Sequence, residues 1–461
     1  MFDKILLSTS TPEIIANDYL HFVNSHPRSL KKFSQSKLLR IIFFTRSLII
    51  MIIRLIKSIF KKKNVLKNHK SDVILVSHLT NISQQFEEHD AYFGNLPTLL
   101  KKHKISSTLV LINHIKADLN ILNTGKKPLF TRFILNETLD FLSELKLCIY
   151  QIKNKKKLFK ILQKLNIDKN HSKNILIHNF SPDTHNALRI AKQVALIIKK
   201  TGANFIFTTY EGHAWERLVY YYTRKINPNI KCFGYQHAAI SKHNYAINRP
   251  LQNYFNPDVI LTSGLITQKI FEDNKHIKSK ITCIGSFKPL PEATNKDTTN
   301  SCLVVPEGIL SECILLFGLS AKYAKKHKNQ KFIWRLHPIL NFENLKNKIC
   351  FFNNLPKNIY LSDRTLDTDI RECSSVLYRG TTTVFRAINA GLSPIYFQES
   401  IGEFNIDPIF NILDGKFIVK NESDLYFALQ QKLSLKQKIR LRDFSRKYFS
   451  PLNLKNLIDL I

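Results

Sequence analysis

Cysteine is scarce in this chain and follows no recognisable spacing. Seven cysteines occur, with no close pair among them, which argues against a disulfide-rich secreted scaffold and against a structural zinc site. A secretory signal is also lacking, because the first apolar run, residues 5–7, is too short and has neither a charged leader nor a cleavage site. We therefore expect a protein of a reducing compartment.

Acidic residues are scarce as well. The sequence has 35 Asp and Glu against 69 Lys and Arg, a formal net charge of +34. Such an excess requires an anionic partner, which could be nucleic acid, an anionic membrane surface or a phosphorylated substrate. Because lysine, asparagine and isoleucine are all frequent, as an A- and T-rich genome would produce, only clusters of basic residues are treated as informative.

Long uncharged apolar runs are lacking even in the most hydrophobic stretch, residues 38–63. Its longest uncharged run, residues 47–53, is far shorter than the roughly 20 residues of a spanning helix. On a helical wheel its basic residues share one arc of about 120°, and Ile, Leu and Phe fill most of the rest. The basic residues are Arg40, Arg46, Arg54, Lys57 and Lys61. This pattern predicts a helix in the membrane interface with residues 61–63 at anionic head groups; a helix docked on the core by its apolar face and a true span are the alternatives.

The remaining sequence predicts an α/β protein. With 461 residues and 44% apolar content, the chain can form two or three domains with their own cores. A basic segment over 1–70, a domain over 71–280 and a domain over 281–461 are expected, with a hinge at 281–300. Residues 129–168 look helical and strongly basic. The main predicted strands are 72–76, 107–112, 174–178, 204–209, 231–235 and 257–264, then 302–305, 332–336, 358–361, 375–378 and 393–397.

Two neighbouring predicted strands of the first domain end in polar residues. Glu211 follows one strand, and Gln236 and His237 follow the next. Ligands bind at such strand ends in open α/β sheets, so Glu211 and His237 should face one crevice. A carboxylate there can accept a proton from an attacking hydroxyl. Glu216 competes for this role, and Glu211 could instead cap the helix that begins near Ala214.

A short loop after the first predicted strand has a composition suited to binding sugars. Asp90, Tyr92 and Gly94 lie in it, and they could hold a sugar by hydrogen bonds and ring stacking. Alternatively, Tyr92 and Phe93 belong to the core and Asp90 is a cap.

In the second domain, an Arg-Leu-His-Pro sequence closes a predicted strand. His337 can donate a hydrogen bond to a phosphate oxygen, and Pro338 fixes the backbone that aims it. Arg335 lies two residues earlier and shares a face with His337 on a regular strand. A purely structural His-Pro is the alternative.

A glycine and three threonines open a later predicted helix, at Gly380, Thr381, Thr382 and Thr383. Free backbone N–H groups and the helix dipole would make an anion site there, although simple N-capping by Thr381 or Thr382 explains the pattern too. The Asp-x-Asp sequence at 367–369 begins another predicted helix, where acids favour the positive helix end, so no metal site is expected.

These features together resemble the motif set of bacterial sialyltransferases, including capsular polysialyltransferases, and of Kdo transferases. More closely, YEGHAWERL at 210–218, GYQHAAI at 234–240 and PDVILTSG at 257–264 resemble a family of bacterial surface carbohydrate biosynthesis proteins. The resemblance covers roughly residues 72–400. It implies a GT-B fold, with two Rossmann-like domains facing a central cleft, the donor nucleotide on the second and the acceptor on the first, and no obligatory metal.

The resemblance also implies roles for individual residues. Glu211 becomes the general base and His337, beside Arg335, a phosphate ligand. The other implied contacts are Glu307, Gly308, Gly380 and Thr381–Thr383 for the donor, and Asp90, Tyr92, Gly94, Gln236 and His237 for the acceptor. Two departures leave the donor sugar open, because the acidic pair before the glycine is Tyr210-Glu211 here and the Ser-Ser/Thr pair is Thr-Thr.

Three functions are consistent with these observations. The leading one is an inverting, metal-independent glycosyltransferase of surface polysaccharide synthesis, peripheral on the inner face of the cytoplasmic membrane, with a CMP-linked acidic sugar as the favoured donor class. The second is a CDP-glycerol type polyol-phosphate transferase. The third is a non-catalytic nucleic-acid or membrane-binding protein, although no recognised nucleic-acid module is present.

Overall fold

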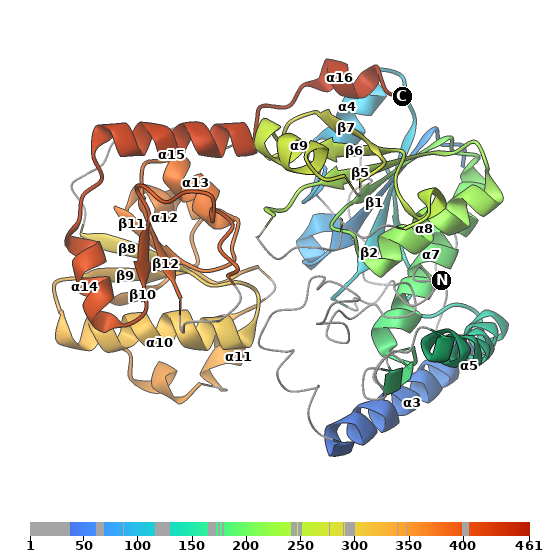
Figure 1. The fold of residues 1–461 in the computed structure, drawn as a ribbon, viewed down its shortest axis with the longest axis horizontal. Helices are drawn as coiled ribbons and strands as arrows, with labels where there is room; N and C mark the ends of the chain where they lie inside the picture. The colour runs from blue at the N-terminus through green and yellow to red at the C-terminus, as the bar shows by residue number, and fades with distance from the viewer. Residues whose placement is uncertain are drawn as a thin grey trace.

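Two α/β domains, each built on its own parallel sheet, make up the described part of the chain (Figure 1). The structure is a computed structural model. It describes residues 37–60, 69–85, 87–115, 130–164, 172–173, 176–177, 179–240, 247, 251–275, 277–288, 290, 300–338, 340–347, 349–398 and 405–461.

The first sheet has seven parallel strands in the order β3-β2-β1-β4-β5-β6-β7. Its middle strands are largely buried on both faces, as their predominantly apolar sequences predict. The order reverses between β1 and β4, the switch point of a Rossmann-like sheet. The strands are β1 Val73–Leu79, β2 Ser107–Asn113, β3 Thr131–Ile134, β4 Phe205–Thr209, β5 Lys231–Gln236, β6 Val259–Thr262 and β7 Lys280–Cys283.

The second sheet repeats this plan with six parallel strands in the order β10-β9-β8-β11-β12-β13. Its switch point lies between β8 and β11, which pair in register from Ser375 with Cys302 to Tyr378 with Val305. The strands are β8 Ser301–Val305, β9 Lys331–Trp334, β10 Ile359–Leu361, β11 Ser375–Tyr378, β12 Ser393–Phe397 and β13 Phe417–Val419.

Helices cover both faces of each sheet, so each domain has an apolar core on either side of its strands. In the first domain these helices are α4 Leu96–Lys102, α7 Pro182–Thr201, α8 Ala214–Ile226 and α9 Leu265–Glu272. In the second they are α10 Leu310–Lys326, α11 Phe342–Lys346, α12 Leu366–Arg371, α13 Thr383–Asn389, α14 Glu422–Gln430 and α15 Leu435–Tyr448. Short 3-10 helices lie at Ile82–Gln85, Asn253–Phe255 and Cys350–Asn354.

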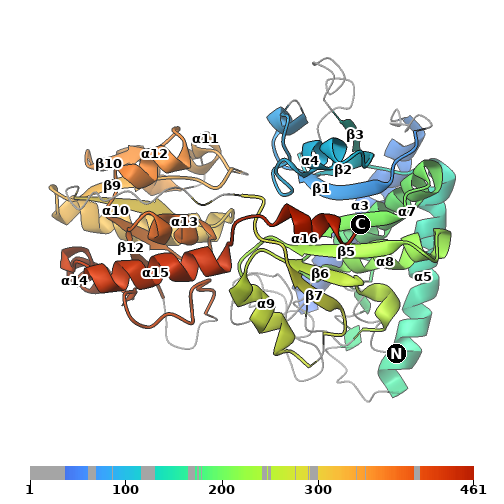
Figure 2. The same cartoon turned by 90° about the horizontal axis from the view of Figure 1, so that it is seen from above.

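The end of the chain returns to the first domain. After α15 the backbone crosses over, and α16 (Leu454–Ile458) lies against the first domain (Figure 2). Leu457 is fully buried in a core cluster of that domain. The backbone N–H of Ser286 donates to the carbonyl of Ser450 at 2.8 Å, and that of Asn453 donates to the carbonyl of Ile284 at 2.7 Å. These hydrogen bonds tie the returning chain to the segment that joins the two domains.

The helices α3 (Lys37–Phe60) and α5 (Phe141–Lys164) lie side by side next to α7, at the lower right of Figure 1. A narrow strip of α3, with Ser47, Met51 and Ser58, is buried against the domain. The predicted basic arc is therefore only partly a solvent face, because Arg46 and Lys57 are exposed whereas Arg54 turns inward and donates to the carbonyl of Pro182 at 3.1 Å. None of the helices in the described ranges is long and apolar enough to cross a membrane.

The α/β class with two Rossmann-like domains is confirmed, whereas three local predictions differ from the structure. Residues 176–177 are helical rather than part of a strand, and residues 174, 175 and 178 lie outside the described ranges. The expected helix at 129–168 contains β3 before α5 begins at Phe141. The expected domain boundary at 281 falls inside β7, so the first sheet extends beyond it. The predicted head-group contact of residues 61–63 and most of the predicted hinge, residues 291–299, also lie outside the described ranges.

Candidate active site

The switch point of the first sheet carries a cluster of imidazoles. His78 near the end of β1 bonds through Nε2 to the Thr209 hydroxyl at the end of β4, at 2.8 Å. Its Nδ1 lies 2.8 Å from Nε2 of His114, which follows β2. Burial, followed by the charge of His114, holds the pKa of His78 well below its usual range. The strand ends thus present neutral imidazoles at the place where an open sheet binds ligands.

Glu211 sits on a tight turn between β4 and α8. Gly212 in this turn has φ +82°, a conformation that a side chain would strain. The turn is held by the carboxylate of Glu216, which accepts the backbone N–H of Glu211 at 3.1 Å and that of His213 at 2.8 Å. His213 and Glu216 form the capping box that starts α8. Glu216 therefore organises the turn; its carboxylate is fully buried, whereas the side chain of Glu211 is 26% exposed.

The pKa values of the two carboxylates are shifted in opposite directions. Burial would raise the pKa of Glu211, but opposing effects, of which the hydrogen bond from His213 at 3.1 Å is the largest, lower it to about 2. Burial raises the pKa of Glu216 to about 7, and the neighbouring Glu211 adds to this rise. Burial likewise lowers the pKa of His237 to about 4. Glu211 is thus ionised at neutral pH, and His237 beside it is neutral.

A cavity of about 290 Å³ lies between the two domains. Tyr92 and His237 reach it from the first domain, and His337 and Thr382 reach it from the second. Glu211 does not line the cavity but lies directly behind His237, with 3.6 Å between Glu211 Oε1 and His237 Nε2. The residues lining the cavity are Tyr92, Tyr235, His237, Ala238, Ser286, Lys288, Leu290, His337, Thr382, Phe385, Arg386 and Phe449.

The loop after β1 brings only its tyrosine to the cavity. The ring of Tyr92 meets that of His237 edge to face, with centroids 4.9 Å apart. Asp90 is buried and bonded within its own turn, where it accepts the Ser77 hydroxyl at 2.8 Å and the backbone N–H of Phe93 at 2.7 Å. Gly94 adopts φ +51°, and a Cβ there would press on the carbonyl of Phe287. Asp90 and Gly94 thus shape the loop that positions Tyr92.

The remaining predicted acceptor residue is also turned inward. Gln236 is buried, and its side chain bonds to the Ala238 carbonyl and accepts the Ser263 hydroxyl at 3.2 Å. It supports the turn that carries His237, the residue that does reach the cavity.

The loops at the second switch point pack against each other. A Cβ on Gly380 would overlap the Glu307 carboxylate, so a larger residue there would force the glutamate side chain to move. Thr381 accepts the backbone N–H of Thr383 at 3.3 Å, while Thr382 is exposed toward the cavity. The helix that follows, α13, has only 7 residues. Glu307, Gly308, Gly380, Thr381 and Thr383 are near the site but do not line the cavity.

The acids of the Asp-x-Asp sequence are paired with arginines. Asp369 is fully buried and bound by Arg335 at 3.0 Å and by Arg364 at 3.1 Å. Asp367 is bound by Arg386 at 2.7 Å. These pairings neutralise both carboxylates, and they direct Arg335 to Asp369 rather than into the cavity.

Two basic residues that line the cavity were not predicted from the sequence. The Lys288 ammonium lies 5.2 Å from the centroid of the Tyr92 ring, on the segment between the domains. Arg386 lies one helical turn after Thr382, on the same face of α13. That spacing was readable from the sequence, whereas the position of Lys288 depends on how the joining segment folds. Lys288 and His337 thus give the cavity two nitrogen-bearing side chains that suit an anion, whereas Arg386 is paired with Asp367 at 2.7 Å.

Comparisons with known proteins concern the architecture. No protein-family model matches the chain, and no curated protein matches it by sequence. Among solved structures, the chain is similar to the glycotransferase of kitacinnamycin, at 9% identity and TM-score 0.49, over 86% of this chain and 99% of that one. It is also similar to a glycosyltransferase from Rickettsia africae, at 14% identity and TM-score 0.47, over 85% and 97% of the two chains. A third is the UDP-GlcNAc 2-epimerase from Neisseria meningitidis bound to UDP-GlcNAc, at 11% identity and TM-score 0.45, over 84% and 98%.

The strand orders define the fold independently of these scores. Two Rossmann-like sheets with a cavity between them, and a final helix that crosses back to the first domain, form a GT-B-like arrangement. This part of the predicted resemblance is confirmed.

Proposed function

We propose that this chain is an inverting, metal-independent glycosyltransferase that moves a sugar from a nucleotide donor to a glycan or lipid-linked acceptor. The observation that carries the proposal is the cavity between the domains. It combines His337, Lys288 and Arg386 with His237 and, behind it, the ionised Glu211. Cationic and N–H groups together with a nearby carboxylate match the two charges that develop in such a transfer.

The proposed roles follow from these positions. Glu211 takes the proton of the acceptor hydroxyl through His237, which lines the cavity, as the oxygen attacks the anomeric carbon. The bond from that carbon to the nucleotide breaks, and its electron pair leaves with the phosphate. Lys288 and His337 stabilise the phosphate charge. Metal independence is proposed because arginines already neutralise Asp367 and Asp369.

The finer assignment rests on the sequence resemblance. Residues 210–218 and 234–240 support surface polysaccharide synthesis, for capsule, O-antigen or lipopolysaccharide, and a CMP-linked acidic sugar is the favoured donor class. We place the enzyme at the inner face of the cytoplasmic membrane, where lipid-linked acceptors are available.

A thermal-shift panel with CMP, UDP, GDP and CDP-glycerol tests the donor site. One nucleotide should raise the unfolding midpoint, because a ligand that binds only the native state stabilises it. The shift should vanish in His337→Ala and persist in His103→Ala, a control on the exposed end of α4. A shift with CDP-glycerol alone would favour polyol-phosphate transfer, and no shift with any nucleotide would refute a nucleotide-sugar enzyme.

The base is tested separately with the donor found in this way. Glu211→Gln should lower the transfer rate by about 10²- to 10⁴-fold and leave the nucleotide shift intact, because Glu211 does not line the cavity. Near-normal turnover in this variant would show that Glu211 is not the base.

A further inference from the structure

The helices α3 and α5 expose an unusual number of large apolar side chains. On α3, Ile49, Ile52 and Ile56 are each more than 50% exposed, and on α5 Leu142 is 64% exposed and Ile152 is 51% exposed. Soluble monomers rarely leave a contiguous apolar surface of this kind in water. The outward faces of α3 and α5 are called here the two-helix surface.

The two helices share a buried junction. Met51 of α3 and Cys148 of α5 lie in one small buried cluster with Phe180, against which Phe44 also packs. An exposed isoleucine follows each of the first two by one position, Ile52 after Met51 and Ile149 after Cys148. One step along a helix turns a side chain by about 100°, so each helix has an exposed isoleucine next to the residue that it buries at the junction.

The charge of the two-helix surface is of one sign. The sequence of α3 contains no acidic residue, and the only acid in α5, Glu144, is fully buried and bonded to His185 at 2.6 Å. Arg46 and Lys57 of α3 are exposed, as are the lysines of α5 from 153 to 160. No carboxylate of these two helices therefore reaches the surface to neutralise the basic side chains.

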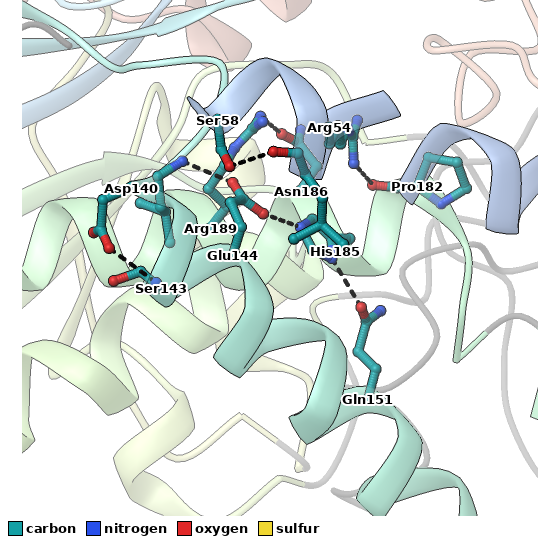
Figure 3. Close-up of polar contacts among 12 residues, drawn as sticks. Arg54, Ser58, Asp140, Ser143, Glu144, Gln151, Pro182, His185, Asn186 and Arg189 are labelled. Atoms are coloured by element: carbon teal, nitrogen blue, oxygen red, sulfur yellow. Dashed lines mark hydrogen bonds and ion pairs between the residues drawn. The ribbon is translucent and has the colours of Figure 1, made fainter. Parts of the chain in front are cut away.

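Polar contacts beneath the surface fix this orientation (Figure 3). Arg54 of α3 points inward to the carbonyl of Pro182, at the start of α7. Between α5 and α7, His185 bridges Glu144 at 2.6 Å and Gln151 at 2.8 Å. Because the buried polar groups of α3 and α5 are bonded within the protein, α3 is held as part of the domain with its apolar face outward.

We propose that the two-helix surface binds the interface of a bilayer that contains anionic lipids. The isoleucines and leucines enter the boundary between head groups and acyl chains, and the lysines of α5 contact lipid phosphates. This inference rests on the proposed function, which places the enzyme at a membrane. It adds the surface and the lipid class that hold the enzyme near a lipid-linked acceptor. The one-signed charge selects an anionic bilayer over a second copy of the chain, whose identical basic surface would be repelled.

Flotation of the full chain with vesicles tests the proposal. Binding to vesicles of phosphatidylcholine with phosphatidylglycerol should exceed binding to phosphatidylcholine alone and should fall as salt is added. Ile52→Asp with Ile56→Asp should weaken binding by about tenfold or more, and Lys156→Glu or Lys160→Glu should each weaken it by about fivefold or more. Leu413→Asp, at a residue 85% exposed on the second domain, is the matched control and should bind as the wild type does.

Three outcomes would overturn the proposal. They are no flotation with anionic vesicles, unchanged binding in the Ile52 and Ile56 variant, and a dimer in solution that this variant converts to monomer. The nucleotide shift is measured on the same variants and should be unchanged. Lipid binding without a nucleotide shift would refute the proposed function alone, and a nucleotide shift without lipid binding would refute this inference alone.

Discussion

The turn that carries Glu211 depends on a single buried carboxylate. Glu216 is fully buried and accepts the backbone N–H groups of Glu211 and His213. In Glu216→Ala both donors lose their acceptor, and each unsatisfied buried group costs about 1–3 kcal/mol. We expect the variant to lose about 2–4 kcal/mol of the free energy of unfolding of the first domain, and to misplace Glu211. In Glu216→Gln one oxygen remains, and since Oε2 lies within 3.2 Å of both nitrogens, the turn should be retained.

The pH dependence of these variants gives the sharper test. Burial raises the pKa of Glu216 to about 7 in the folded state, above its ordinary value of 4.5. A raised pKa means that the folded state binds the proton more tightly, so the stabilisation is present below pH 4.5 and is lost as the pH rises through 7. The difference corresponds to about 3 kcal/mol, or a change in midpoint of about 6–12 °C for a domain of this size.

The assay compares unfolding midpoints of the wild type and Glu216→Gln between pH 5 and 8. Relative to the glutamine variant, the wild type should lose stability as the pH rises, because glutamine does not titrate. Other titrating groups, such as His237, are common to both proteins and cancel in the difference. A difference that stays flat over this range would refute the assignment of the raised pKa to Glu216.

Two further predictions concern a lysine that lines the cavity and an ion pair buried in the second domain. Lys288→Met should weaken nucleotide binding, measured by calorimetry, by about tenfold or more, because a hydrogen bond to a charged group contributes about 1.5–3 kcal/mol; Lys288→Arg should retain most of the affinity, and equal affinities in all three proteins would contradict the role. Glu312→Ala should destabilise the second domain by about 3–5 kcal/mol in denaturant unfolding, since it leaves Arg379, its fully buried partner at 2.5 Å, without a counter-charge. Adding Arg379→Met should recover much of that loss, and a single variant within about 1 kcal/mol of the wild type would show that the pair is not needed.

The strands were predictable because parallel sheets buried on both faces read as short apolar runs. The predicted strand at 393–397 coincides with β12, and those at 107–112 and 231–235 each end one residue before β2 and β5 do. β3 and β13 escaped notice, because β3 lies in a stretch that reads as helix and β13 has 3 residues. Residues 176–177 show the reverse error, since an apolar run of this length suits either structure.

The site was predictable where chemistry and strand ends coincide. Tyr92, His237, His337 and Thr382 do line one cavity. Arg335 does not, because a regular strand was assumed to extend to His337, whereas β9 ends at Trp334 and Arg335 turns to the buried Asp369. Lys288 was missed because its position is set by the return of the chain end, through contacts far apart in sequence such as that of Ser286 with Ser450.

The orientation of α3 shows what a helical wheel leaves open. The wheel separates a basic arc from an apolar one, but it does not say which arc meets the protein. The domain offers α3 both an apolar contact at Phe180 and a carbonyl acceptor at Pro182. A buried arginine needs such an acceptor, so the strip that includes Arg54 docks and the broad isoleucine face is left outside. A helix docked by its apolar face would have hidden that surface, and the structure contradicts this alternative through the partners that the inward residues find.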